Sequence, residues 1–125
     1  MKATQDLIEK ELLRLCQQGQ FEALLLFNDE GIPMAEVGEC VHYTKDTLTA
    51  LSVIFAQAVE LVNDFQGDAP LNENSIRTNN KFRIVSRPIP LNEFTLTLVA
   101  IVPVQRPYRK LTNAAIQKIQ QFMQE

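Results

Sequence analysis

The stretch ALLLFNDEGIPMA, residues 23–35, decides the fold. Its first five residues form an unbroken apolar run, which predicts a strand that is covered on both faces and is therefore central in its sheet. The tetrapeptide that ends at Gly31 is a tight-turn sequence, because Asn and Asp bond back to nearby backbone and glycine accepts a positive φ. Residues 32–36 then return as a second strand. Pro33 donates no ladder hydrogen bond, so we expect this strand at the sheet edge.

Helical spacing of apolar residues predicts three helices, over residues 4–18, over 44–66 and after Pro107. The middle helix has Thr44 as its candidate N-cap and Gly67 as its candidate terminator. Its apolar side chains fill a stripe about 160° wide, whereas a helix that lies on one sheet needs only about 100°. We therefore expect this helix to contact something besides its own sheet.

The second half of the chain predicts three more strands, over residues 74–78, 81–86 and 94–102. Asn79 and Asn80 suit a two-residue type I′ turn between the first two of them. Residues 87–93 contain two prolines, so we expect an irregular loop there. Because short turns join the strand pairs, the sequence predicts an α+β fold with one five-stranded antiparallel sheet, in a single domain over residues 1–125.

Composition excludes several classes of protein. The chain has 125 residues, of which 46% are hydrophobic and 22% charged, which is typical of a globular domain. Twelve basic and fifteen acidic residues give a net charge of −3, without the basic excess of a nucleic-acid-binding protein. We expect no signal peptide, no membrane span and no disulfide framework, since no apolar run approaches about 20 residues and only Cys16 and Cys40 are present. This predicts a cytoplasmic protein.

Residue types that carry chemistry are scarce. Four glycines do not build a Walker A or dinucleotide-binding loop, and one histidine excludes a multi-histidine metal centre. Cys40 and His42 project to the same side of an extended segment, so they remain open as two metal ligands or as a thiol nucleophile with its base. We interpret them as an ordinary connection between a strand and a helix. The sequence therefore predicts no cofactor, no metal and no enzyme activity.

Basic residues gather in two places. Lys81, Arg83 and Arg87 alternate along one strand and so share a face, which Arg77 can join across the turn. The other group lies at the start of the last helix, where the helix dipole disfavours cations. Each group is either a solvated face or a contact surface for an acidic protein partner. The candidate partner contacts are Lys81, Arg83, Arg87, Arg106 and Arg109.

The order of elements, together with residues 23–35, resembles the roadblock family, which is related to dynein light chains and to bacterial small-GTPase regulators. The helix over residues 48–65, the three later strands and the closing helix extend this resemblance over nearly the whole chain. The resemblance implies a profilin- or longin-like sheet with the strand order 2-1-5-4-3. It also implies that the long helix covers one face and the other two helices cover the opposite face.

The resemblance further implies a homodimer, in which the third strands pair edge to edge and the long helices lie together. The residues that it places at the interface are Thr49, Ser52, Val53, Ala56, Glu60, Ser75 and Arg77. Such a dimer usually acts as a platform or regulator for a Ras-like small GTPase and has no active site of its own. The function expected is therefore a non-catalytic homodimeric scaffold. The alternative is a PAS-like sensory module that holds a small ligand between sheet and helix.

Overall fold

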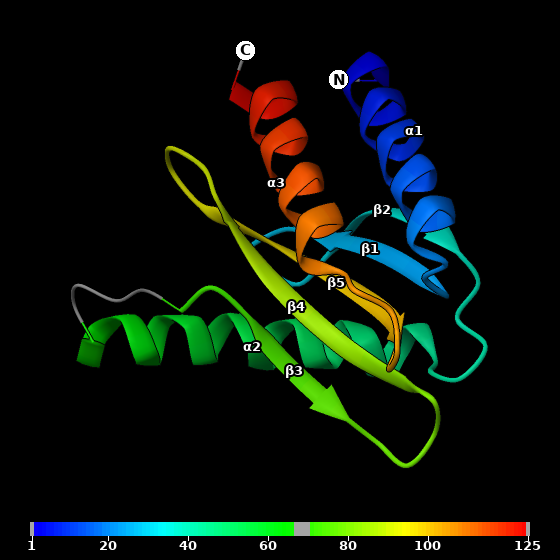
Figure 1. The fold of residues 1–125 in the computed structure, drawn as a ribbon. Coiled ribbons are helices and arrows are strands. Elements are labelled where there is room, and N and C mark those ends of the chain that lie inside the picture. The colour runs from blue at the N-terminus through cyan, green and yellow to red at the C-terminus, as the bar shows by residue number, and fades with distance from the viewer. Residues whose placement is uncertain (1, 67–70, 125) are drawn as a thin grey trace.

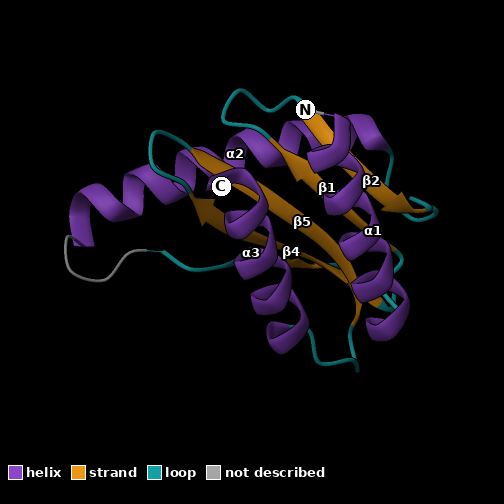
Figure 2. Cartoon of the chain, turned by 90° about the horizontal axis from the view of Figure 1, so that it is seen from above, coloured by secondary structure: helices purple, strands orange, loops and turns teal. Residues whose placement is uncertain are grey.

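The computed structural model describes residues 2–66 and 71–124 and has three helices and a five-stranded sheet (Figure 1). The sheet is antiparallel throughout and has the order β2-β1-β5-β4-β3. Figures 1 and 2 show α1 and α3 on one face of the sheet and α2 on the other. The predicted α+β class, strand order and helix placement are confirmed. The elements are α1 (Lys2–Gly19), β1 (Ala23–Phe27), β2 (Pro33–Gly38), α2 (Lys45–Gln66), β3 (Asn74–Arg77), β4 (Phe82–Pro90), β5 (Thr95–Pro103) and α3 (Arg109–Gln124).

Strand β1 has a core on each of its faces, as its unbroken apolar sequence predicts. All five of its residues are buried. Leu24 and Leu26 belong to the core beneath α1 and α3, whereas Leu25 and Phe27 belong to the core beneath α2. Because successive side chains of a strand point to opposite faces, a central strand needs apolar residues at every position.

The turn between β1 and β2 forms as its sequence predicts. The Asn28 side-chain oxygen accepts hydrogen bonds from the backbone N–H groups of Glu30 (2.8 Å) and Ile32 (2.9 Å). Gly31 has a φ of +82°, which favours glycine over any residue with a Cβ. Strand β2 lies at the sheet edge, where the missing N–H of Pro33 is tolerated.

The prediction of an irregular loop over residues 87–93 is wrong for its first half, because β4 continues to Pro90 and stays paired with β5. The two prolines fit because their nitrogens face away from β5. Leu91 donates its N–H to the Phe94 carbonyl (2.8 Å), so odd-numbered residues of this strand bond to β5. Even-numbered residues face β3, which begins opposite Ser86. Beyond Ser86 no described strand pairs with this side of β4, so Pro88 and Pro90 remove no ladder hydrogen bond.

The predicted type I′ turn at Asn79 and Asn80 is also wrong. Such a turn needs a positive φ at both central residues, and among the described non-glycine residues only Gln20 has one. Strand β3 ends at Arg77 and β4 begins at Phe82, so the connection is a longer loop. The Asn80 side-chain oxygen accepts a hydrogen bond from the Phe82 N–H (2.9 Å). This side-chain contact holds the loop, and neither asparagine adopts a positive φ.

Helix boundaries follow their predicted signals closely. Thr44 caps α2, because its hydroxyl oxygen accepts the Thr47 N–H at 3.1 Å. The proposed terminator Gly67 lies outside the described residues. Pro107 stands two positions before α3 begins at Arg109, so it lies ahead of the helix and not in its first turn.

Candidate protein-interaction surfaces

Helix α2 rests on the sheet through one narrow face. Leu48, Ser52 and Phe55 are buried there, and their spacing of four and three residues is that of one side of a helix. Ser52 is only 1% exposed, and its hydroxyl donates a hydrogen bond to the Thr49 carbonyl at 2.7 Å. The space between α2 and the sheet is filled by the second core. The PAS-like alternative therefore gains no supporting observation.

One flank of α2 exposes large apolar side chains. Ile54, Leu61 and Phe65 are 55%, 59% and 81% exposed. They recur at intervals of seven and four residues, which places them on one side of the helix. The segment Lys45–Phe65 is the one described helix long and apolar enough for a membrane crossing by length and composition, which alone is weak evidence, and 17% of its most apolar window is buried. The protomer thus leaves much of this helix uncovered.

The opposite flank of α2 approaches the turn between β1 and β2. A Cβ built on Gly31 would lie 2.6 Å from a methyl group of Val53. Ala56 and Glu60 line a hollow of about 320 Å³ together with Asp29 of that turn. Because this flank faces β1, the flank that carries the exposed apolar side chains faces away from β1, toward the β4–β3 side of the sheet.

The structure divides the predicted interface residues between different surfaces. Ser52 is buried beneath the helix, so its assignment to a contact between copies is wrong. On the flank toward β1, Val53 and Glu60 are exposed while Thr49 and Ala56 are half-buried. The width of the apolar stripe predicts a second contact for this helix, but the resemblance places that contact at Thr49, Ser52, Val53, Ala56 and Glu60 and not at the exposed apolar flank. The signal that marks this flank is the second apolar row at positions 54, 58, 61 and 65.

Strand β3 is the free edge of the sheet on the β4 side. It pairs with β4 along four residues and ends the strand order, so one row of its backbone groups has no partner within the described protomer. Ser75 and Arg77, which were predicted at a joined edge, are both exposed. Such an edge is a template for pairing with another strand.

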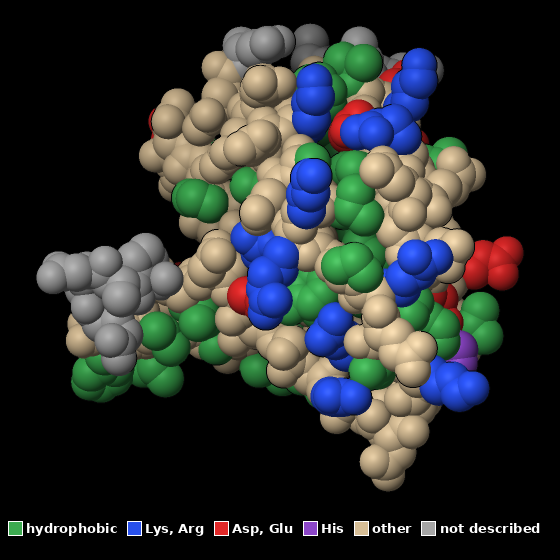
Figure 3. All heavy atoms as spheres, in the orientation of Figure 1, with side chains coloured by type: hydrophobic (Ala, Val, Ile, Leu, Met, Phe, Trp, Pro, Cys, Tyr) green, Lys and Arg blue, Asp and Glu red, His purple; other side chains and the backbone are tan. Residues whose placement is uncertain are grey.

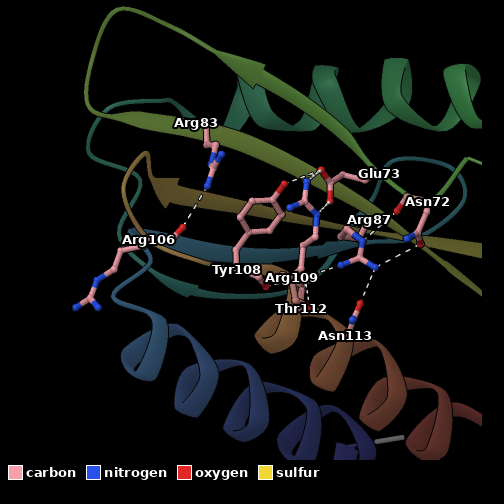
Figure 4. Close-up of polar contacts among 9 residues, drawn as sticks. All are labelled: Asn72, Glu73, Arg83, Arg87, Arg106, Tyr108, Arg109, Thr112 and Asn113. Atoms are coloured by element: carbon pink, nitrogen blue, oxygen red, sulfur yellow. Dashed lines mark hydrogen bonds and ion pairs between the residues drawn. The ribbon is translucent and has the colours of Figure 1, made fainter.

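Arg87 is a structural residue, so its assignment as a partner contact is wrong. It is 4% exposed and donates hydrogen bonds to four oxygens, two of Asn72 and one each of Thr112 and Asn113 (Figure 4). These bonds measure 2.7–3.3 Å. Burial lowers the pKa of this guanidinium, and the charge of Glu73 opposes that shift. Arg87 thereby ties the segment that enters β3 to α3.

Tyr108 gathers two of the other predicted arginines. The guanidinium of Arg83 lies 4.6 Å from the centre of the Tyr108 ring and that of Arg109 lies 5.0 Å from it. Arg83 also donates a hydrogen bond to the Arg106 carbonyl at 3.2 Å. Figure 4 shows these side chains converging from β4 and α3. The structure therefore brings the Arg83 and Arg109 side chains together at Tyr108, whereas the Arg106 side chain points away and donates to Gln20 at 3.1 Å. Lys81 stands exposed in the loop before β4.

Glu73 is the acidic member of this cluster. It accepts a hydrogen bond from the Tyr108 hydroxyl at 2.6 Å and forms an ion pair with Arg109 at 3.1 Å. Burial by itself would raise the pKa of this carboxyl, but the hydrogen bonds from Tyr108 and Arg109 lower it overall. Burial and the Glu73 carboxylate raise the pKa of Tyr108. Glu73 is thus a charged acceptor that joins the start of β3 to α3.

Cys40 and His42 support a connection between β2 and α2. A ring nitrogen of His42 contacts the Glu22 carboxylate, whose other oxygen accepts the N–H groups of Val41 and His42 at 3.2 Å. The His42 ring also stacks on Phe82 at 4.6 Å. Burial raises the pKa of the Cys40 thiol, which disfavours the thiolate that a nucleophile requires. Within residues 2–66 and 71–124, no three Cys, His, Asp or Glu side chains gather as metal ligands.

The chain has the fold of the roadblock/LC7 domains. No family model and no curated protein matches the sequence. Among solved structures, MglB of Myxococcus xanthus is similar with a TM-score of 0.80 at 13% identity, over 96% of this chain and 90% of that chain. A Roadblock/LC7 domain from Streptomyces avermitilis has a TM-score of 0.71 at 9% identity, over 94% and 98% of the two chains. LokiProfilin1, in its complex with rabbit actin, has a TM-score of 0.55 at 11% identity, over 95% and 96%.

Proposed function

We propose that this protein is a non-catalytic homodimeric scaffold that binds a Ras-like small GTPase and modulates its state. The observation that carries the proposal is the position of two uncovered surfaces on one side of the protomer. The exposed apolar flank of α2 faces the β4–β3 side of the sheet, and β3 is the unpaired edge on that side. One second copy, related by a two-fold axis, covers both surfaces at once.

In this dimer the two β3 strands pair and the two α2 helices lie together. Backbone hydrogen bonds between the strands use the free row of groups at Asn74–Arg77. Ile54, Leu61 and Phe65 of each copy become buried against the partner helix. Ser75 and Arg77 remain in the interface as expected from the resemblance, and the apolar flank takes the place of the residues that face β1.

The GTPase partner is supported by the fold, which the chain shares with MglB and with roadblock/LC7 domains. A rigid platform of two sheets and two helices regulates by positioning, because it stabilises one conformation of the GTPase switch segments over another. An arginine supplied in trans is one further means of acting on a GTPase. Arg87 is buried and Arg77 lies in the proposed dimer interface, so both are excluded from that role, whereas Arg109 is exposed. We propose a cytoplasmic location for this protein.

Two measurements test the proposal. Sedimentation velocity over a concentration series should show a dimer, and a stable monomer at high concentration contradicts the interface. Pull-down from a lysate of the source cells, with the bait loaded on beads and GDP or a GTP analogue added, should recover a small GTPase in one nucleotide state preferentially. Recovery of no GTPase in either state contradicts the regulatory function while leaving the dimer intact. The purified protein alone should hydrolyse no GTP.

A further inference from the structure

A strongly basic surface covers the end of the sheet where β3, β4 and the start of α3 meet. We call it the basic face, and it contains half of the chain's twelve basic residues but only one of its fifteen acidic residues, Glu73. In the space-filling view of Figure 3, Lys and Arg side chains run over α3, β4 and β3 with few acidic ones beside them. The members of the basic face are Arg77, Lys81, Arg83, Arg106, Arg109 and Lys110.

The charges of the basic face are poorly compensated within the protomer. Among the described residues only Arg109 of this set forms an ion pair. Arg77 lies directly opposite Arg83 in the β3–β4 register, and like charges at such positions destabilise a sheet. The Nε atom of Arg83 is buried and has no hydrogen-bond partner. The Nη2 atom of the same guanidinium donates to the Arg106 carbonyl at 3.2 Å, which carries no net charge and so leaves the charge of Arg83 uncompensated.

The start of α3 also places positive charges where they are unfavourable. Arg109 and Lys110 occupy the first turn of the helix, where the positive end of the helix dipole disfavours cations. No acidic residue stands in that turn. Two features of one surface, namely the facing arginines and the cations at a helix N-terminus, therefore each carry a cost that an anionic partner removes.

We propose that the basic face binds an acidic segment of a partner protein. Within the proposed function, on which this inference rests, the segment belongs to the bound GTPase. The whole chain has a net charge of −3, so the rest of the molecule is acidic and repels an extended polyanion such as a membrane or a nucleic-acid duplex. A short acidic segment meets only the basic face. The ring of Tyr108 carries a guanidinium within 5.0 Å of its centre from both Arg83 and Arg109, so it is not a free platform for a base.

A hollow beside the basic face is a candidate binding site for such a segment. Its volume is about 620 Å³, and it lies between the β3–β4 loop and the end of β5. Arg77 and Lys81 stand on its wall, and Phe82 and Pro103 provide apolar surface. Carboxylates of the segment contact the cations, and Lys81, which is exposed and lies outside β3, stays accessible in the proposed dimer.

The test uses a fluorescein-labelled peptide of glutamates as the probe. Lys81→Glu combined with Lys110→Glu reverses two charges of the basic face at exposed positions outside β3. The matched control combines Lys10→Glu with Lys118→Glu, which changes the net charge equally at exposed positions of α1 and α3. Fluorescence anisotropy should show binding to the wild type that weakens roughly tenfold in the first variant and stays within about twofold in the control. Added salt should weaken the binding of the wild type, because it screens exposed charges.

Three results overturn the inference. The first is equal loss in both double variants, which indicates an effect of net charge alone. The second is no binding of the peptide to the wild type. The third is tighter binding of vesicles that contain phosphatidylserine, or of duplex DNA, than of the peptide. Sedimentation velocity on both double variants separates the two proposals: loss of peptide binding with an unchanged dimer concerns only the basic face, whereas a monomeric wild type contradicts the proposed dimer and leaves the peptide result standing.

Discussion

Replacing Leu61 by glutamate tests whether the exposed flank of α2 joins two copies. Complete burial of a Leu, Ile or Phe side chain contributes about 1.5–3 kcal/mol. Ile54, Leu61 and Phe65 are 55%, 59% and 81% exposed in the protomer, so covering each contributes about 1–2 kcal/mol. Six such side chains in a dimer contribute about 6–12 kcal/mol, against a cost of association of about 4–15 kcal/mol. In the proposed dimer, burial of the apolar flank therefore nearly offsets the free-energy cost of association. Pairing of the β3 strands supplies the remaining favourable free energy.

Leu61→Glu removes the contribution of one leucine from each copy, which amounts to about 2–4 kcal/mol per dimer. Because about 1.4 kcal/mol corresponds to a factor of ten, the dissociation constant should rise roughly 30- to 1,000-fold. Two carboxylates brought together add repulsion in the same direction. Leu61 lies on the surface of the protomer, so the fold of the monomer should be unaffected. Sedimentation velocity over a concentration series measures the shift, and circular dichroism verifies the fold.

Val53→Glu is the matched control, because Val53 is also an exposed apolar residue of α2 but lies on the flank toward β1. It should leave the dissociation constant unchanged. A dimer that tolerates Leu61→Glu refutes the assigned interface. A dimer that tolerates Leu61→Glu but is lost with Val53→Glu shows instead that the copies meet through the flank that faces β1.

Three further predictions concern the protomer itself. Arg87→Met should lower the free energy of unfolding by about 2–4 kcal/mol, measured by urea denaturation, since it removes the donor to the buried Thr112 hydroxyl and to part-buried oxygens of Asn72 and Asn113. An unchanged stability contradicts a structural role. Leu98→Ala should cost about 2–5 kcal/mol in the same assay, because Leu98 is fully buried in the core beneath α1 and α3. The folded protein lowers the pKa of Glu73, so its carboxylate contributes stability above the ordinary glutamate pKa and loses it as pH falls through the lowered value. Urea midpoints below about pH 4 should therefore fall less steeply in Glu73→Gln than in the wild type, and parallel curves would contradict this.

Local signals explain why so much of the fold was predictable from the sequence. The continuous apolar run of β1, the Asn and Gly of its turn and the Thr44 cap each act through residues within a few positions, and each forms as expected. The continuation of β4 through Pro88 and Pro90 was not predictable in this way. It depends on where β3 begins, because only the absence of a neighbour on that side makes prolines harmless.

The basic residues were harder to assign, because an alternating pattern gives the face of a strand but not what covers that face. Arg83 and Arg87 do share a face, as predicted, and α3 packs against it. Arg87 lies where α3 covers the strand and is buried, whereas Arg83 lies nearer the end of the helix and stays half-buried. The sequence contains the four oxygens that satisfy Arg87, but their residues are 15–26 positions away in the chain. Only the tertiary fold brings them together.

The proposed interface depends on the rotational orientation of α2 about its own axis. Ser52 shows why this orientation is hard to predict from the sequence. A stripe about 160° wide does not say which of its edges rests on the sheet. The family resemblance places Ser52 at the contact between copies, which would turn it away from the sheet. Its hydroxyl instead donates a hydrogen bond to the Thr49 carbonyl one turn earlier in the same helix. Because the hydroxyl is already hydrogen-bonded, burying Ser52 costs little free energy. With Ser52 turned inward, the helix rotates Ile54 and Leu61 out of the core, and the apolar surface left for a partner lies on the flank opposite to the predicted one.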